Sequence, residues 1–271
     1  MKRIQLFEFE DFSWFPTMWR STMTKIIVVF HKLLGTAEVL GELLIQIRKR
    51  HPFTQIVDMG SGSGGAMPMA VEYVQTQTPD VPTSLLLTDL HPNATFVEAF
   101  NQSQRPNMTY SSNSLDATHL SEAPEGLKTM INSFHHMPPP IAHEILATAQ
   151  ANKQPILIQE MTENNIPTLA WALALPLSLP LVALTSMIFV PFVKPLNWKD
   201  LLFTWLIPVI PIFYAWDGQA SMPRMYTFED IKKYLLPEPD AHYTWEIAQA
   251  QKKDGKKRGY YILGLPQSHD V

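Results

Sequence analysis

Short apolar runs alternate with amphipathic segments along the middle of the chain. The runs that have the length and β-branched content of buried strands are 54–59, 84–89, 128–133 and 155–160, with a weaker one near 108–111. The segments between them that space apolar residues as a helix does are 66–76, 92–103 and 138–151. This alternation predicts an α/β fold, with a parallel, doubly wound sheet covered by helices on both faces.

Both ends of the chain add further elements to this pattern. Residues 22–50 have helical spacing on either side of Gly35, which predicts a helix or a helix pair that Pro52 ends. Near the C-terminus, 242–251 and 259–265 are strand candidates around an Asp-Gly turn signal. The five cations within 252–258 fit a solvated hairpin tip or, alternatively, a contact with anionic lipid headgroups.

A long hydrophobic insertion separates these two parts. No residue between Glu163 and Lys194 is charged, and a second uncharged run extends from Leu201 to Trp216. A membrane span needs about 20 apolar residues, so the first run is long enough and the second is short. We expect the prolines to kink or break helices in both runs; they are Pro176, Pro180, Pro208 and Pro211. Because the chain must return to the same domain, a hydrophobic helical hairpin is predicted.

Three interpretations of residues 166–216 remain open at this stage. The segment is a membrane-embedded hairpin (spanning or re-entrant), a soluble lid over a pocket for an apolar substrate, or a dimerisation arm. Lys194 and Lys199 in the connecting loop favour a shallow insertion over two full spans. The aromatic residues expected at the membrane interface are Trp198, Trp205, Tyr214 and Trp216.

Charge and composition exclude several kinds of function. The net charge of -4 and pI of about 6.1 provide no basic field for nucleic acid. The absence of cysteine excludes disulfides, thiolate zinc sites and a cysteine nucleophile. No metal-binding spacing is present, so no metal is expected. The acidic start of the chain is unlike a signal peptide, which predicts a location on the cytoplasmic side of a membrane or in the cytoplasm.

The chemistry-bearing stretch is a glycine-rich turn between a strand and a helix. Four of the 11 glycines fall within residues 55–65, and only glycine lets a backbone approach a ligand so closely. Asp89 ends the next strand, where an acid accepts hydrogen bonds from ribose hydroxyls. Asp58, two residues before the first glycine, would repel a pyrophosphate and attract an ammonium group. A ligand with both an ammonium group and a ribose, such as S-adenosylmethionine (SAM), fits these features.

The run Asp58-Met59-Gly60-Ser61-Gly62-Ser63-Gly64 resembles the D/E-x-G-x-G-x-G motif of class I SAM-dependent methyltransferases. The resemblance covers about residues 50–163 and a C-terminal piece. It implies a Rossmann-like sheet with an antiparallel last strand, SAM as cofactor, and Asp116 against the adenine amine. The cofactor-binding residues that it implies are Asp58, Gly60, Ser61, Gly62, Gly64, Asp89, Leu90, Asp116, Ala117 and Ser133.

Candidate catalytic and substrate residues follow from this assignment. His135 and His136 come after the fourth strand, where the family's methyl group points, and histidine is the natural general base near neutral pH. The pair could equally bind substrate or cap the next helix. The candidate substrate-binding residues are Trp14, Trp19, Arg20, Glu160, Arg224 and Tyr226. Alternatively, the aromatic N-terminus is a packing cap and Arg224 pairs with a nearby acid.

We therefore predict a SAM-dependent methyltransferase that acts on a hydrophobic or lipid-like small molecule at a membrane. The alternatives are a soluble small-molecule methyltransferase with a hydrophobic lid and a non-catalytic, methyltransferase-like membrane adaptor. The expected domains are an N-terminal cap or lid (1–52), the SAM-binding core (53–163), the hydrophobic insertion (164–217) and the C-terminal part of the core (218–271).

Overall fold

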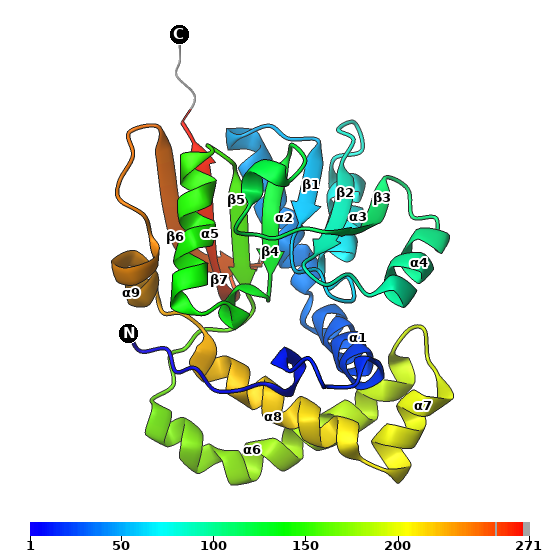
Figure 1. The fold of residues 1–271 in the computed structure, drawn as a ribbon. Coiled ribbons are helices and arrows are strands. Elements are labelled where there is room, and N and C mark those ends of the chain that lie inside the picture. Colours follow the sequence, from blue (N-terminus) through cyan, green and yellow to red (C-terminus); the bar gives the residue numbers. More distant parts are fainter. Residues whose placement is uncertain (253, 268–271) are drawn as a thin grey trace. The chain divides into compact units, whose positions relative to one another are not determined.

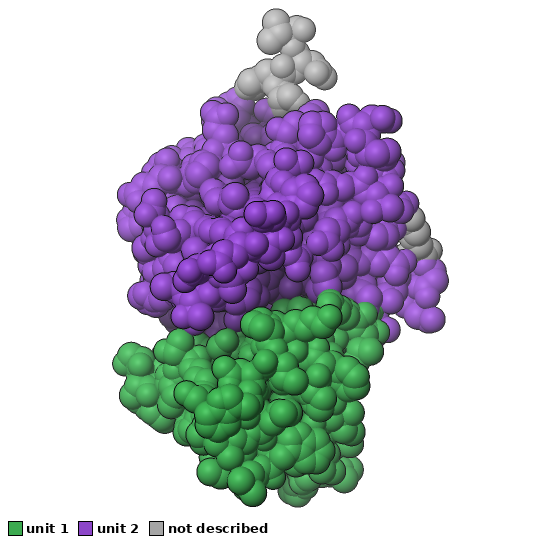
Figure 2. Space-filling model, turned by 90° about the vertical axis from the view of Figure 1, so that its right-hand side faces the viewer, with its two compact units in different colours: residues 1–34, 163–227 green, residues 35–162, 228–271 purple. Residues whose placement is uncertain are grey.

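The computed structural model describes residues 1–252 and 254–267, and it divides the chain into two compact units. Unit 1 comprises Met1–Leu34 and Glu163–Thr227; unit 2 comprises Gly35–Thr162 and Phe228–Val271 (Figure 2). The chain thus leaves unit 2 after Thr162 and returns to it at Phe228. Lys253, one of the cations of the predicted hairpin tip, and 268–271 lie outside the described residues.

Unit 2 is built on one seven-stranded sheet (Figure 1). Its strands are β1 (Gln55–Asp58), β2 (Ser84–Asp89), β3 (Met108–Ser114), β4 (Leu127–Ile131), β5 (Ile156–Glu160), β6 (Tyr243–Gln251) and β7 (Lys257–Pro266). The order is β3-β2-β1-β4-β5-β7-β6, in which the first five strands are parallel and β7 runs antiparallel to β5 and β6. The predicted Rossmann-like sheet with an antiparallel last strand is confirmed.

Helices cover both faces of this sheet, with α5 in front and α2 and α3 behind it in Figure 1. The helices of unit 2 are α2 (Thr36–Arg50), α3 (Met67–Gln77), α4 (Ala94–Gln102), α5 (Pro139–Ala151) and α9 (Phe228–Asp230), with short turns at Leu120–Glu122, Phe134–His136 and Ile231–Leu235. In α2, Leu40, Leu44 and Ile47 share one face and are buried against the core that includes Ile56 and Leu85.

The strand order reverses between β1 and β4, and this reversal positions the functional site. Loops that leave two such strands at their carboxyl ends turn toward opposite faces, and the crevice between them is where parallel α/β sheets bind ligands. Asp58 of β1 lies beside Thr129 of β4 in the register. The glycine turn after β1 and the segment Asn132–His136 after β4 therefore lie at the same edge of the sheet.

Unit 1 is helical. Its elements are a short turn at Phe9–Asp11, α1 (Thr17–Leu34), α6 (Thr168–Phe189), a turn at Val190–Phe192, α7 (Trp198–Leu201), a π-helical turn at Leu202–Leu206 and α8 (Val209–Arg224). Asn164, just before α6, donates its side-chain amide to the carbonyls of Pro223 (3.1 Å) and Met225 (3.2 Å) at the end of α8. The start of α6 thus lies at the end of α8, and the two helices pack antiparallel.

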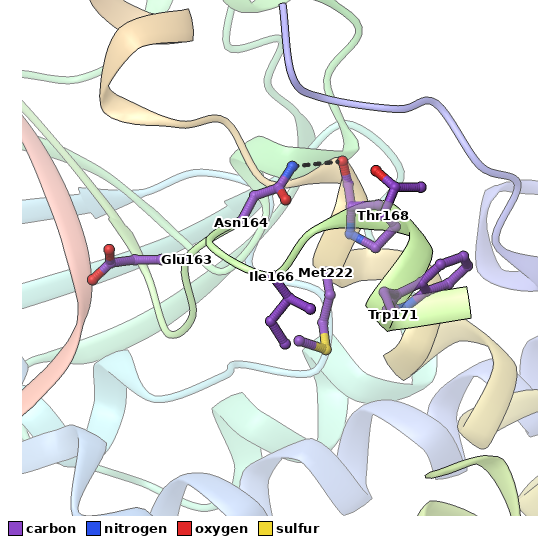
Figure 3. Close-up of a pocket in the computed structure, with 7 residues that line it drawn as sticks. Glu163, Asn164, Ile166, Thr168, Trp171 and Met222 are labelled. Carbon is purple, nitrogen blue, oxygen red and sulfur yellow. Dashed lines mark hydrogen bonds between the residues drawn. The ribbon is translucent and has the colours of Figure 1, made fainter. Parts of the chain in front are cut away.

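A small pocket opens where these two helix ends meet (Figure 3). Asn164, Ile166 and Trp171 line it from the side of α6, and Met222 and Pro223 line it from α8. The polar anchor of Asn164 forms one wall. The pocket belongs to unit 1 and contains none of the residues of the glycine turn.

The prolines of the two uncharged runs have different effects on their helices. Helix α6 continues through Pro176 and Pro180, although each proline removes one backbone donor. The second run does break, at Ile207 and Pro208, where the helices on either side meet at 81°. Ile207 leaves the helical region (φ -124°, ψ 79°), which agrees with the exclusion of a residue before proline from the α conformation.

The units divide the chain at different places from the predicted domains. Gly35 (φ 66°) separates α1 from α2, and α2 belongs to unit 2 because its apolar face enters the sheet's core. The predicted cap of residues 1–52 is therefore shared between the units. Residues 218–227, assigned to the core from the sequence, continue α8 in unit 1.

Within residues 1–252 and 254–267, one helical segment, Thr168–Phe192, is long and apolar enough to cross a membrane. Only 11 % of its most apolar window is buried within the structure. The bent pair Trp198–Leu206 and Val209–Arg224 passes the same test only when its two parts are taken together. Both results follow from length and composition alone.

Candidate active site

The glycine turn joins β1 to α3 in a conformation that side chains rarely adopt. Gly60, Gly62, Gly64 and Gly65 have φ of 66°, 51°, 89° and 52°, a left-handed region that is accessible at low cost only to glycine. A Cβ placed on Gly62 or Gly65 would meet no atom within 4 Å. The turn thus presents bare backbone toward open space, as a loop that cradles a ligand requires.

Asp58 lies beneath this turn and is 3 % exposed. Its carboxylate accepts hydrogen bonds from the hydroxyls of Ser61 (2.7 Å) and Thr129 (2.6 Å). Burial raises its pKa to about 7, against the opposing effect of those hydroxyls. The sequence suggested an acid that attracts a ligand's ammonium group; the structure shows the carboxylate bound within the protein, where it holds Ser61 and the turn in place.

Asp89, at the end of β2, is oriented by two backbone donors. One carboxylate oxygen accepts from the amide of Gly62 and the other from the amide of His91, both at 2.9 Å. Each oxygen keeps a second lone pair, so the side chain can still accept hydrogen bonds from a diol. The next residue, Leu90, is 47 % exposed and provides an apolar surface beside that acid.

Asp116 and Ala117 follow β3 at the same edge of the sheet. One oxygen of Asp116 accepts from both the amide and the hydroxyl of Thr118, each at 2.8 Å. The hydrogen bond from the Thr118 amide is the main cause of a lowered pKa, which keeps the carboxylate ionised at neutral pH. Its other oxygen faces His119 at 3.7 Å, and the side chain is 42 % exposed.

Ser133, after β4, carries a buried hydroxyl beside the glycine turn. Its hydroxyl is buried, yet it has no hydrogen-bond partner among residues 1–252 and 254–267. It lies against the glycine turn, because a Cβ on Gly60 would come within 3.2 Å of it. A buried hydroxyl without a partner costs free energy, so a bound group that pairs with it is favoured. Together with the open glycine turn and Asp89, this hydroxyl fits a polar ligand such as SAM.

His135 and Glu160 form a buried pair at the same edge. The Glu160 carboxylate accepts the backbone N–H of His135 at 2.9 Å and lies 2.9 Å from its Nδ1. Glu160 is fully buried and His135 is 5 % exposed. The pairing assigns the Nδ1 proton to the bond with Glu160, which makes Nε2 the basic atom of a neutral ring. His136 packs beside it, with ring centroids 4.3 Å apart. Glu160, predicted to bind substrate, thus binds and orients His135.

The predicted substrate residues of the N-terminus belong to unit 1, where two of them take part in packing and hydrogen bonding. Trp19 packs against the ring of Phe213, with centroids 5.5 Å apart. Arg20 donates to the carbonyl of Phe12 at 2.8 Å. Trp14, in contrast, is 64 % exposed. The alternative of an aromatic packing cap therefore describes Trp19, while Trp14 remains accessible.

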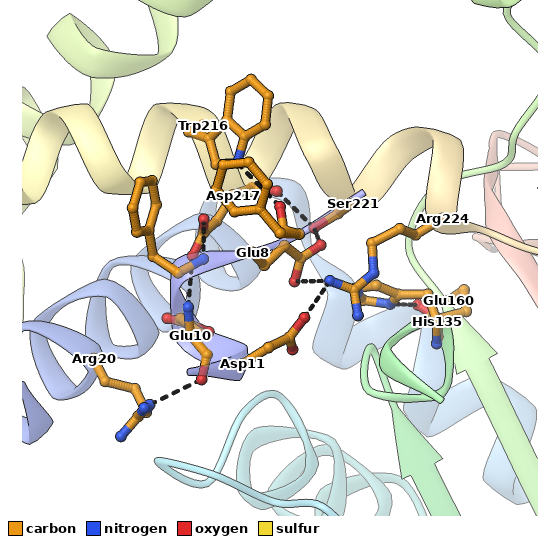
Figure 4. Close-up of polar contacts among 12 residues, drawn as sticks. Glu8, Glu10, Asp11, Arg20, His135, Glu160, Trp216, Asp217, Ser221 and Arg224 are labelled. Atoms are coloured by element: carbon orange, nitrogen blue, oxygen red, sulfur yellow. Dashed lines mark hydrogen bonds and ion pairs between the residues drawn. The ribbon is translucent and has the colours of Figure 1, made fainter. Parts of the chain in front are cut away.

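Arg224 and Tyr226 are also buried (Figure 4 draws Arg224). Arg224 forms ion pairs with Asp11 (2.5 Å) and Glu8 (3.3 Å), both from the N-terminal segment. The guanidinium of Arg3 lies over the Tyr226 ring, 4.7 Å from its centroid. The sequence left open whether Arg224 pairs with a local acid; its partners in the structure are acids, but Asp11 lies 213 residues away in the sequence.

Three positioning residues were missed from the sequence. The hydroxyl of Thr129 holds Asp58, that of Thr88 donates to the Asp58 carbonyl at 2.9 Å, and that of Tyr110 donates to the Gly62 carbonyl at 2.8 Å. Threonines within otherwise apolar strands were the available signal for the first two. Tyr110 had none, because a tyrosine in a strand is as typical of a core as of a site.

A scan of protein-family models and a search of curated proteins found no match to the sequence. Solved structures do resemble the chain. The plantazolicin methyltransferase BpumL in complex with SAH covers 93 % of this chain and 96 % of its own, with a TM-score of 0.52 and 12 % identity. The related BamL, with an analog and SAH, covers 93 % and 99 % (TM-score 0.49, 10 % identity). The CMeT domain of the citrinin polyketide synthase covers 83 % and 50 % (TM-score 0.44, 16 % identity).

At these identities the likeness concerns the fold, and the BpumL structure supports it over nearly the full length of both chains. The strand order, the antiparallel β7 and the glycine turn after β1 agree with that likeness. The chain therefore has the fold of the class I SAM-dependent methyltransferases.

Proposed function

We propose that this protein is a SAM-dependent methyltransferase that methylates a hydrophobic or lipid-like small molecule at the cytoplasmic side of a membrane. The buried hydroxyl of Ser133, without a partner in the described chain and adjacent to the open glycine turn, is the observation that carries the cofactor assignment. The backbone of the turn and the carboxylates of Asp89 and Asp116 would hold the cofactor. SAM, when bound, supplies the electrophilic methyl group.

The protein's own part in the chemistry is positioning and proton removal. Methyl transfer needs the acceptor held in line with the donor and water excluded. An acceptor that carries a proton also needs a base, and His135 provides one because Glu160 fixes its ring through Nδ1. The apolar acceptor is supported by the exposed leucines of α6, which give this chain an affinity for lipid phases that a water-soluble substrate would not require.

Cofactor affinity, measured by calorimetry with SAM and with SAH, tests the assignment. We expect Asp89→Asn to weaken both ligands at least tenfold, because charge-assisted hydrogen bonds are worth about 1.5–3 kcal/mol each. Ser133→Ala should weaken binding severalfold while leaving the melting temperature of the free protein unchanged or higher. Asp80→Asn, an exposed carboxylate in the α3–β2 loop, is the matched control. Equal affinity in all four proteins would overturn the proposal.

A further inference from the structure

The outer face of α6 is a continuous apolar stripe. Six residues at helical spacing are each between 58 and 79 % exposed: Leu169, Leu173, Leu177, Leu181, Leu184 and Ile188. Together they expose roughly 700 Å² of apolar surface, which exceeds the largest patch of a typical soluble monomer. Because the segment between Glu163 and Lys194 has no charged side chain, no ionic group interrupts the stripe.

The inner face of α6 is attached to α8 by polar bonds. Trp171 donates its indole N–H to the carbonyl of Gln219, and Ser178 donates its hydroxyl to the side-chain oxygen of the same residue, both at 3.1 Å. Ser178 stands near the middle of α6. The depth of the middle of α6 in a membrane therefore determines the depth of Gln219 as well.

This attachment argues against a transmembrane α6. Asp217, two residues before Gln219, accepts the backbone amides of Phe9 (2.8 Å) and Glu10 (3.1 Å) from the acidic N-terminal segment (Figure 4). If α6 crossed a bilayer, this carboxyl and the bound segment would lie in hydrocarbon, where ionisable groups are costly. Within unit 1, α8 lies between α6 and the N-terminal segment (Figure 1). A helix lying in the membrane plane leaves all of these groups on the water side.

The residues after α6 are suited to lipid headgroups. Lys194 is exposed in the connection to α7, and Trp198 and Lys199 are exposed at the start of α7, where the Lys199 amine lies 5.8 Å from the Trp198 ring centroid. Trp205, 55 % exposed, follows in the next turn. Tryptophan prefers the interface between headgroups and acyl chains, and lysines are attracted to anionic lipids. A protein partner would instead require polar groups around the patch that fix its orientation, which the uncharged stripe of α6 does not offer.

We propose that α6 docks flat on an anionic membrane, with its leucine stripe in one leaflet and Lys194 and Lys199 at the headgroups. The juxtaposition that supports this is an uninterrupted apolar outer face and an inner face bonded to polar groups of α8. This inference rests on the proposed function in that both place the chain at a membrane. It goes further in excluding a span and in naming the face that inserts.

The chain contains no cysteine, so single-cysteine variants report the depth of each position without further engineering. We would label Leu169→Cys, Leu177→Cys and Ile188→Cys with an environment-sensitive fluorophore. Quenching by lipids that carry the quencher at defined depths would be read in phosphatidylcholine vesicles containing phosphatidylglycerol. Flat docking predicts similar, shallow depths for all three. A span predicts a deep Leu177 between two interfacial positions, and that result would overturn the proposal. Val81→Cys, in unit 2, should stay aqueous.

Vesicle flotation of the full chain provides the second arm. We expect the double variant Leu173→Glu, Leu177→Glu to reduce vesicle binding at least tenfold. The double variant Lys194→Ala, Lys199→Ala should reduce binding about tenfold on anionic vesicles and little on neutral ones. An apolar label environment without vesicles, accompanied by dimerisation, would assign the stripe to a second copy and refute docking. Calorimetry of SAM on the same samples separates the two proposals: normal affinity without vesicle binding refutes docking alone.

Discussion

The buried carboxyl of Asp58 makes the stability of unit 2 depend on pH in a way that one substitution can isolate. Its pKa lies at about 7 instead of 3.8, chiefly because burial disfavours the charged form. Between these values the folded state binds the proton and the unfolded state does not, so stability falls as the pH rises through this window. Because the unfolded state loses its proton in this window and the folded state keeps it, the raised pKa removes about 4 kcal/mol of stability by pH 7, at about 1.4 kcal/mol per pKa unit.

Asp58→Asn keeps an uncharged group of the same shape, and the Ser61 and Thr129 hydroxyls can rotate to pair with it. We expect the free energy of unfolding of this variant, relative to that of the wild type, to increase by up to about 4 kcal/mol as the pH rises from 4 to 7. Above pH 7 this difference should change little. Any stability difference between the two proteins that does not depend on pH leaves this pH dependence unchanged.

Hydrogen exchange of peptides that contain β1 and β4 measures this difference for unit 2 specifically. Wild type and variant are compared at the same pH, so the intrinsic pH dependence of exchange cancels. Asp80→Asn, which replaces an exposed carboxyl, should track the wild type throughout. A difference between Asp58→Asn and wild type that stays constant from pH 4 to 7 would refute the reasoning, because it would mean that burial does not control this carboxyl.

Two further predictions concern the edge of the sheet. With a lipid extract as substrate, His135→Gln should reduce the rate of SAH release at least 100-fold while SAM affinity stays within twofold of the wild type. Glu160→Gln should reduce that rate about tenfold, and His242→Gln should have no effect. Unchanged turnover in His135→Gln would exclude a base at His135. Gly259→Ala should lower the melting temperature far more than Gly255→Ala. Both glycines have left-handed φ, but only a Cβ at Gly259 would lie 1.8 Å from the Glu160 carbonyl oxygen. Equal shifts in differential scanning calorimetry would contradict this prediction.

Local sequence signals were sufficient for the architecture of unit 2. The predicted strands at 54–59, 84–89 and 155–160 agree with β1, β2 and β5 to within a residue or two. Apolar runs of that length are typical of strands buried on both faces, and their alternation with helical segments indicated a parallel sheet covered by helices. The glycine turn was equally readable, because its backbone conformation excludes other residues.

The insertion was less predictable, because whether a proline ends a helix depends on the tertiary packing around that helix as well as on the local sequence. A kink or a break was expected at Pro176 and Pro180; α6 does not break there, because packing along α8 and the polar bonds to Gln219 support the helix through them. The second run did break before Pro208, because proline disfavours the helical conformation of the residue before it, Ile207. The two apolar runs thus formed one continuous helix and one bent pair.

The sequence by itself determined which residues form the strands and which loop is left bare for a ligand, since both depend on local periodicity and on glycine. Only the tertiary structure decided which partners the buried polar side chains bind. Asp58 turned inward to Ser61 and Thr129, Glu160 turned to His135, and Arg224 turned to Asp11 and Glu8. The physical reason is that a charged side chain removed from water takes whichever partner the fold brings within reach, and one of these partners, Asp11, lies 213 residues from Arg224 in the sequence.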